Sequence, residues 1–185
     1  MRPQRLSPLA ALVVLFAAPP PAAPETLLTA TIGRAFGGDL EQGELSYGAS
    51  IGFMGDGIVG FEVEGVYTPD VFGDTPAGTN NITTLMGNLL LGAPLGEAGR
   101  IYAKGGVGIM KFRVPDVDDF FDIDSNDFGM NAGAGVMVNL GERFALKGEI
   151  AYFRNLEDPE PDNDFDVDFG GFSYWRGSAG LSLRF

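Results

Sequence analysis

The sequence predicts an all-β fold, in which eight antiparallel strands form an up-and-down barrel. After residue 25, eight segments alternate between apolar residues and small or polar ones with a period of two, the pattern of strands whose faces meet different surroundings. The connections between these segments are alternately short and long, which is typical of a barrel with turns at one end and loops at the other. No helical pattern of useful length interrupts them.

The first four strands differ in how clearly they alternate. In the first, Leu28 and Ile32 share one face while Thr29 and Thr31 occupy the other. The second and third follow the same rule, and the short Asp56-Gly57 turn between them has the chemistry favoured in two-residue hairpins. The fourth alternates least well. These strands are predicted to be Leu27–Gly37, Leu45–Gly55, Ile58–Thr68 and Asn81–Gly92.

The last four strands contain the cleanest alternation. In the sixth, every second residue from Phe128 to Leu140 is apolar, and most residues between them are Gly or Asn. In the seventh, Lys147 and Glu149 lie opposite the apolar face. The eighth ends on Phe185, in phase with its apolar face, so we expect that strand to reach the last residue. These strands are predicted to be Arg100–Phe112, Asp127–Leu140, Phe144–Arg154 and Phe172–Phe185.

The long connections follow the first, third, fifth and seventh strands, and the short ones follow the second, fourth and sixth. The expected long connections are residues 38–44, 69–80, 113–126 and 155–171. Strict alternation of this kind indicates short periplasmic turns and longer extracellular loops if the barrel crosses a membrane.

Residues 1–24 have the features of a secretory signal peptide. Arg2 and Arg5 precede an apolar run from Leu9 to Ala18, which is followed by Pro and Ala residues. Ten apolar residues are fewer than the ~20 that a transmembrane helix needs, although an uncleaved anchor stays an alternative. We expect residues 25–185 to form the barrel domain, with the cleavage position between Ala18 and Pro24 left open.

Composition excludes several classes of function. The chain has no Cys and no His, so it lacks disulfides, thiolate metal sites and the usual general base of enzymes. A Ser-His-acid catalytic device is therefore excluded, and we expect neither an enzyme nor a cofactor. The formal net charge of −13 argues against nucleic acid as a partner.

Six charged residues lie on the polar faces near the middles of the strands. They comprise three acids and three bases, a balance that favours a paired network inside the barrel over a solvated surface. An interior of eight strands is just wide enough for side chains to fill it, so such a network predicts a closed plug, with a narrow ion path as the alternative. The residues are Glu62, Glu64, Lys104, Lys147, Glu149 and Arg176.

Aromatic residues on the apolar faces form two bands around an aliphatic middle. This is the girdle pattern of a barrel that crosses a bilayer, with apolar residues facing lipid and polar residues facing inward. The band at the long-loop ends comprises Phe36, Tyr47, Tyr67, Phe128, Tyr152 and Trp175, and the band at the short-turn ends comprises Phe53, Phe144 and Phe185. The sequence therefore predicts a transmembrane β-barrel.

Three basic residues break the apolar pattern. Arg34, Lys111 and Arg154 face lipid by parity and lie at the long-loop ends of their strands. A charge near the bilayer interface costs only about 0–1 kcal/mol. One hypothesis is contact with lipopolysaccharide phosphates, and the alternative is snorkelling to lipid headgroups.

The long connections contain most of the acidic residues. Clustered carboxylates suit calcium, but these runs lack the glycine and closing Glu of an EF-hand loop, so a hydrated, mutually repelling surface is the favoured interpretation. Residues 165–169 continue the alternation of the eighth strand, which predicts that this strand projects above the membrane. The weak calcium candidates are Asp116, Asp118, Asp162, Asp164 and Asp166.

These features together resemble the small eight-stranded outer-membrane barrels of the OmpA and OmpX type. The resemblance covers roughly residues 26–185 and rests on the signal peptide, the eight segments, the YAKGGVGIM and LKGEIAYF stretches and the terminal GLSLRF. It implies insertion into the bacterial outer membrane by the barrel-assembly machinery, which recognises such a final strand.

That family acts through different loops, so fold does not give function. We expect a non-enzymatic protein with a role in envelope integrity or surface interaction. A small-solute pore and a secreted, lipocalin-like ligand carrier are the alternatives.

Overall fold

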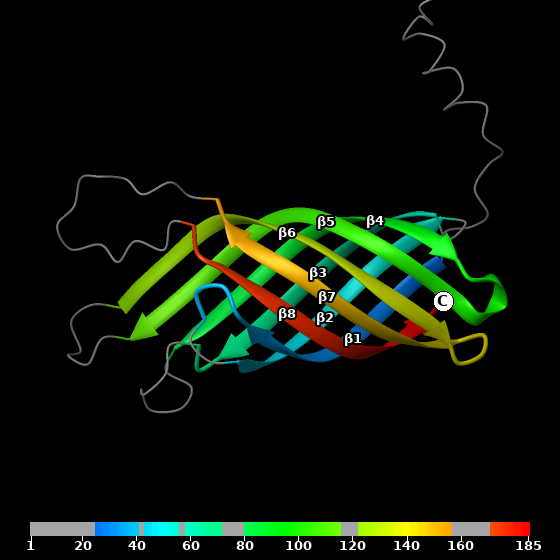
Figure 1. The fold of residues 1–185 in the computed structure, drawn as a ribbon, viewed down its shortest axis with the longest axis horizontal. Coiled ribbons are helices and arrows are strands. Elements are labelled where there is room, and N and C mark those ends of the chain that lie inside the picture. Colours follow the sequence, from blue (N-terminus) through cyan, green and yellow to red (C-terminus); the bar gives the residue numbers. More distant parts are fainter. Residues whose placement is uncertain (1–24, 41–42, 56–57, 72–79, 116–121, 157–170) are drawn as a thin grey trace, which may run out of the picture.

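The predicted barrel is confirmed by a computed structural model, which describes residues 25–40, 43–55, 58–71, 80–115, 122–156 and 171–185. The eight strands of these residues form one closed antiparallel sheet, in which each strand pairs with its sequence neighbours and β1 pairs with β8 (Figure 1). The strands are β1 Glu25–Phe36, β2 Glu44–Gly55, β3 Val59–Pro69, β4 Asn81–Pro94, β5 Gly99–Pro115, β6 Asp122–Asn139, β7 Phe144–Asn155 and β8 Ser173–Arg184.

The two ends of the barrel differ, as the alternation of short and long connections predicts. We call the end with the β4–β5 and β6–β7 connections and the C-terminus the turn end, and the opposite end, where β1 stops and β2 starts, the loop end (Figure 1). A single 3₁₀ turn, η1 Gly96–Ala98, lies in the β4–β5 connection. No helix in the part of the chain that the structure describes is long and apolar enough to cross a membrane.

The predicted long connection at residues 113–126 is shorter than expected. The β5–β6 ladder continues through it, pairing Arg113 with Asp124, Val114 with Ile123 and Pro115 with Asp122. The sequence prediction ended these strands where their apolar alternation stopped. An antiparallel ladder needs only paired backbone groups, so it continues beyond the lipid-facing pattern.

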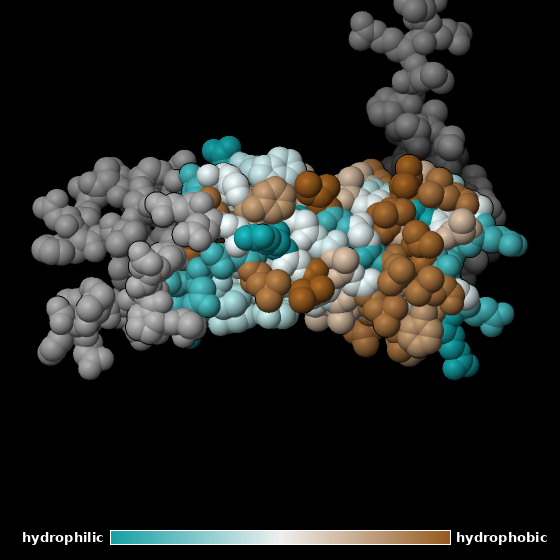
Figure 2. All heavy atoms as spheres, turned by 60° about the horizontal axis from the view of Figure 1, so that its bottom comes forward, coloured by the Kyte–Doolittle hydropathy of each residue, from teal (hydrophilic) through white to brown (hydrophobic). Residues whose placement is uncertain are grey.

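The outward faces of the strands are apolar along most of the barrel. On β4, for example, Leu85, Leu89 and Leu91 are more than half exposed, whereas Thr84, Met86 and Asn88 between them are buried. Figure 2 shows the most hydrophobic side chains gathered over the half of the barrel near the turn end, with paler and more polar ones towards the loop end. The protein therefore presents its apolar residues to the surroundings, which suits a bilayer and not water.

An apolar cluster packs the loop-end half of the interior, beside buried polar groups such as the hydrogen-bonded Asn155–Asp127 pair. Phe153 stacks on Tyr174 with 5.0 Å between ring centroids, and Phe112 meets Phe172 edge-on at 5.2 Å. Met86, like these rings, belongs to one buried cluster. The weak alternation of the fourth predicted segment has its cause here, because the inward face of β4 contributes Ile82 and Met86 to this cluster.

Candidate functional site in the barrel interior

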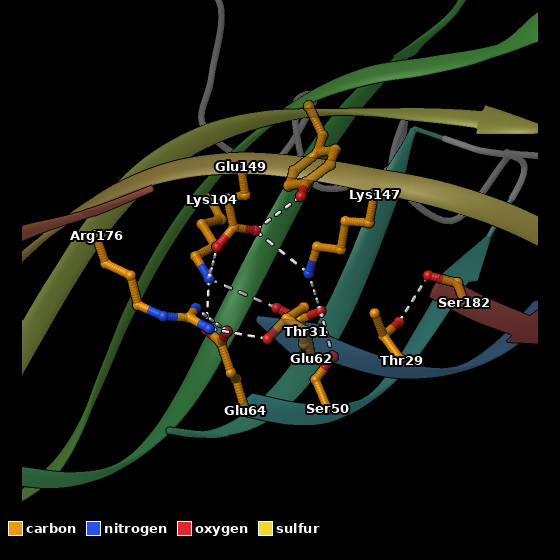
Figure 3. A network of polar contacts seen from close by, with 11 residues as sticks. Thr29, Thr31, Ser50, Glu62, Glu64, Lys104, Lys147, Glu149, Arg176 and Ser182 are labelled. Atoms are coloured by element: carbon orange, nitrogen blue, oxygen red, sulfur yellow. Dashed lines mark hydrogen bonds and ion pairs between the residues drawn. The ribbon is translucent and has the colours of Figure 1, made fainter. Parts of the chain in front are cut away.

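The structure brings all six charged residues on the polar faces into one buried network. They project inward from four strands: Glu62 and Glu64 from β3, Lys104 from β5, Lys147 and Glu149 from β7, and Arg176 from β8 (Figure 3). Each retains at most 7% of its accessible surface. Because inward residues alternate along a strand, the i and i+2 pairs on β3 and β7 enter the same space.

Lys104 lies at the centre of this network. Its Nζ lies 2.6 Å from Glu64 Oε2, 2.5 Å from Glu149 Oε1 and 3.7 Å from Glu62 Oε1. A single ammonium group therefore meets all three carboxylates (Figure 3). A buried charge is tolerated only when it is paired and hydrogen-bonded in this way.

Lys147 joins opposite walls of the barrel. Its Nζ lies 2.6 Å from Glu62 Oε2 and 3.3 Å from Glu149 Oε2. The closed strand order places β7 and β3 four strands apart in either direction, so the Lys147–Glu62 pair crosses the lumen. The interior is thus bridged at mid-height by charged side chains and not lined by them.

Arg176 completes the network from β8. Its Nη1 donates to Glu64 Oε1 at 3.1 Å, its Nε to Ser46 Oγ at 3.0 Å and its Nη2 to Thr31 Oγ1 at 2.8 Å. The sequence predicted a paired network without assigning partners within it, and the structure pairs Arg176 with Glu64. The guanidinium spreads its donors over three strands, which suits its fork geometry.

Sequence reasoning missed the uncharged members of the site. Tyr102 Oη donates to Glu149 Oε2 at 2.7 Å, and Ser50 Oγ donates to Glu62 Oε2 at 3.0 Å. Both residues lie on the inward face, and the two-residue alternation of their strands is enough to predict this. The sequence prediction of the interior network considered charged side chains only, so it did not include uncharged hydrogen-bond donors such as Tyr102 and Ser50.

Gly135 leaves the space that the side chain of Tyr102 occupies. A Cβ built on Gly135 would overlap the phenol of Tyr102, so only a residue without a side chain fits on that part of β6. Glycine is found in strands where another group approaches the backbone closely.

A second ionic cluster closes the turn end. Glu25 at the start of β1 pairs with Arg184 at the end of β8, and its Oε2 accepts from Arg100 Nη2 of β5 at 2.6 Å. Arg100 also contacts Met54 of β2 through its other terminal nitrogen. The first and last strands are therefore joined by side chains in addition to their ladder.

Glu25→Gln is expected to lower the free energy of unfolding by about 1 kcal/mol, because two guanidinium groups lose their shared carboxylate. The cluster is partly exposed, so the loss should shrink when salt is raised from ~0.1 M to ~1 M and the charges are screened. Urea unfolding in lipid vesicles at the two salt concentrations measures both effects. A loss independent of salt would show that the pair does not act through its charges.

The predicted aromatic girdle residues all lie on the outward face. Eight of the nine are at least 39% exposed, and Tyr152 is half-buried because it packs on Trp175 at 5.2 Å between centroids. Cross-strand register places Tyr47 beside Tyr67, and Phe36 beside Trp175. Phe61, which sequence reasoning did not include, lies opposite Phe53 in the turn-end band.

The three basic residues of the apolar pattern lie at the loop end. Arg34 and Arg154 are exposed, and Lys111 is half-buried. Arg34 donates from Nε to the carbonyl oxygen of Gly43 at 3.0 Å, whereas the side chain of Arg154 has no polar partner among the described residues. Several sequence predictions lie outside those residues: the signal peptide at 1–24, the projecting segment at 165–169 and the calcium candidates Asp116, Asp118, Asp162, Asp164 and Asp166.

Comparison with known proteins identifies the architecture. The family described as "Outer membrane protein beta-barrel domain" matches residues 8–185. The N-terminal barrel domain of Pseudomonas aeruginosa OprF is 20% identical, over 87% of this chain and 97% of that chain, with a TM-score of 0.56. Neisserial surface protein A (NspA) is 12% identical, over 90% and 100% of the two chains, with a TM-score of 0.65.

The same fold also occurs in an enzyme. The outer membrane enzyme PagL is 12% identical, over 85% of this chain and 98% of that chain, with a TM-score of 0.50. No curated protein matches the chain. These identities are low, so the structural likeness shows the fold alone, whereas the family match covers nearly the whole chain and confirms the resemblance inferred from the sequence. The chain belongs to the outer membrane protein beta-barrel domain family and is a bacterial outer membrane barrel.

Proposed function

We propose that this protein is a closed, non-conducting and non-enzymatic barrel that supports the outer membrane and presents its loops for surface interaction. The observation that carries the proposal is the Lys147–Glu62 pair, which crosses the lumen at 2.6 Å. A conducting path would need these charges to separate in a low-dielectric interior, which is costly.

The apolar cluster of the loop-end half adds a second barrier. Met110, Phe112 and Phe153 are fully buried in the interior, between the charge network and the loop end. Hydrated ions are disfavoured beside these three side chains, because their apolar groups cannot replace the water that an ion would lose. The two barriers together support a plug in preference to the narrow pore that the sequence left as an alternative.

The non-enzymatic part of the proposal rests on chemistry. The chain has no His, and the six interior charges are engaged with one another, so none is available to a substrate. The outer membrane family and the outward apolar face both disfavour a secreted ligand carrier. The barrel-assembly machinery and outer-membrane lipids are the partners that we propose for insertion and residence.

Planar-bilayer recording tests the closed state. The purified wild-type barrel is expected to give no steady unitary conductance, while an open porin inserted in the same lipid gives one. Insertion of the silent barrel is verified by its heat-modifiable migration on gels. Steady conductance of the wild-type protein that rises with salt concentration would overturn the proposal in favour of a pore.

A further inference from the structure

A trough runs over the outside of the barrel where small residues interrupt the apolar surface. One part has a volume of about 730 Å³ and is lined by Ala103, Ala134 and Gly148 with larger apolar residues around them. A second part of about 470 Å³ shares Ala134 and Ile150 with the first. The two parts are therefore continuous across β5, β6 and β7, and we call them the lipid-facing trough.

The trough reaches the aromatic band at the loop end. Its second part is lined by Tyr152 and Trp175, whose ring centroids are 5.2 Å apart. Its first part is lined by Ile58 and Leu91 near the turn end. A groove that runs along the membrane-crossing surface and is lined almost entirely by apolar side chains matches a hydrocarbon chain. Its volume falls in the range of ligand pockets, about 300–1,000 Å³.

The basic side chain of Arg154 lies just beyond the loop-end opening of the trough. Ile150, Tyr152 and Arg154 are successive outward residues of β7, so the Arg154 side chain emerges about 7 Å past Tyr152 towards the loops. The side chain of Arg154 is exposed and has no polar partner within the described residues. An acyl chain in the trough would therefore place its headgroup beside a guanidinium that has no polar partner among the described residues. A guanidinium is the group best suited to phosphate.

We propose that the lipid-facing trough is a binding site for lipopolysaccharide, with an acyl chain over Ala134 and a lipid A phosphate on Arg154. The proposal deepens the proposed function, because it names a lipid that the closed barrel holds. We choose lipopolysaccharide over phospholipid because the loop end faces the outer leaflet. In lipopolysaccharide, the phosphates of lipid A lie close to its acylated sugars. Among the three basic residues of the loop end, the geometry assigns this role to Arg154.

The chain carries its own reporter for this site. Trp175 is the single tryptophan of the sequence and lines the trough, where it is 42% exposed. Brominated acyl chains quench tryptophan fluorescence on contact. In vesicles of brominated phosphatidylcholine, Trp175 should be quenched, and an unbrominated lipid that occupies the trough should restore its fluorescence.

The experiment titrates purified lipid A into these vesicles against unbrominated phosphatidylglycerol and phosphatidylcholine. Lipid A is expected to restore the Trp175 emission at about fivefold lower mole fraction than phosphatidylcholine, the factor that one cation–phosphate contact supplies. Arg154→Gln should remove this preference, whereas Arg34→Gln, whose native side chain is bonded to Gly43, should retain it. Ala134→Phe should fill the trough and lower the preference, while Ala30→Phe on the outward face of β1 should not.

Four results would overturn the proposal. The first three are a lipid A effect no greater than dilution by phosphatidylcholine, equal losses for Arg154→Gln and Arg34→Gln, and an equal preference for phosphatidylglycerol. Protection of Trp175 that depends on the protein-to-lipid ratio and not on lipid A would assign the trough to a second copy of the chain, and would also overturn it. None of these results changes the conductance of the barrel, so the proposed closed state is tested separately.

Discussion

Lys104→Met is expected to lower the free energy of unfolding by about 3–5 kcal/mol, because it leaves buried carboxylates without their shared partner. The Nζ of Lys104 lies within 2.6 Å of carboxylate oxygens of both Glu64 and Glu149. Both glutamates are at most 7% exposed, so water cannot solvate their carboxylates once the lysine is lost. Equilibrium urea unfolding in lipid vesicles, followed by the fluorescence of Trp175, measures the loss.

Two further variants separate the network from a general effect of losing a lysine. Lys111→Met removes a half-buried cation at the loop end of the same strand, outside the network, so the loss of stability should be smaller than for Lys104→Met. Adding Glu149→Gln to Lys104→Met should recover part of the loss, because it neutralises one stranded carboxylate. Equal losses for the two lysine variants, or no recovery in the double variant, would contradict the proposed network.

Gly106→Val is expected to prevent most of the protein from folding, whereas Gly105→Val next to it should fold like the wild type. A Cβ on Gly106 would overlap the carbonyl oxygen of Gly87 and the side chain of Asn88 on the neighbouring strand. A Cβ on Gly105 points outward, and the nearest atom, the carbonyl oxygen of Asn131, lies 3.9 Å away. Valine favours strands, so propensity cannot explain a loss at one position only.

Heat-modifiable gel migration after refolding into vesicles reports the folded fraction of both glycine variants. Overpacking of an interior typically costs about 1–3 kcal/mol and more where backbone must move, as it must beside Gly87. Similar folded fractions for the two variants would show that the interior closes without a glycine at position 106.

Much of this architecture could be predicted from residue order alone. Alternation assigned Leu89 and Asn88 to opposite faces, and it assigned Lys104 and Glu62 to the interior, because a strand turns successive side chains to opposite sides whatever it pairs with. The weak fourth segment was a real signal. Its inward apolar residues, Met86 among them, belong to the buried apolar cluster. In the sequence, these residues only made the alternation of the segment less regular.

The alternation pattern cannot predict which residues on opposite walls of the barrel lie close together. That Lys147 meets Glu62 depends on closure of the sheet, which brings β7 opposite β3, and the residues of these two strands share no ladder. The lipid-facing trough likewise exists only because small residues of three strands fall side by side in register, as Ala103 does with Ala134.

The sequence by itself determined the strands, their inward and outward faces and the balanced set of interior charges. These depend on local geometry, since the two-residue period of a strand is independent of its neighbours. The tertiary structure alone decided which charges pair, that an apolar cluster packs the loop-end interior, and that the trough ends near Arg154. These depend on strand register and closure, which place residues far apart in the chain at contact distance.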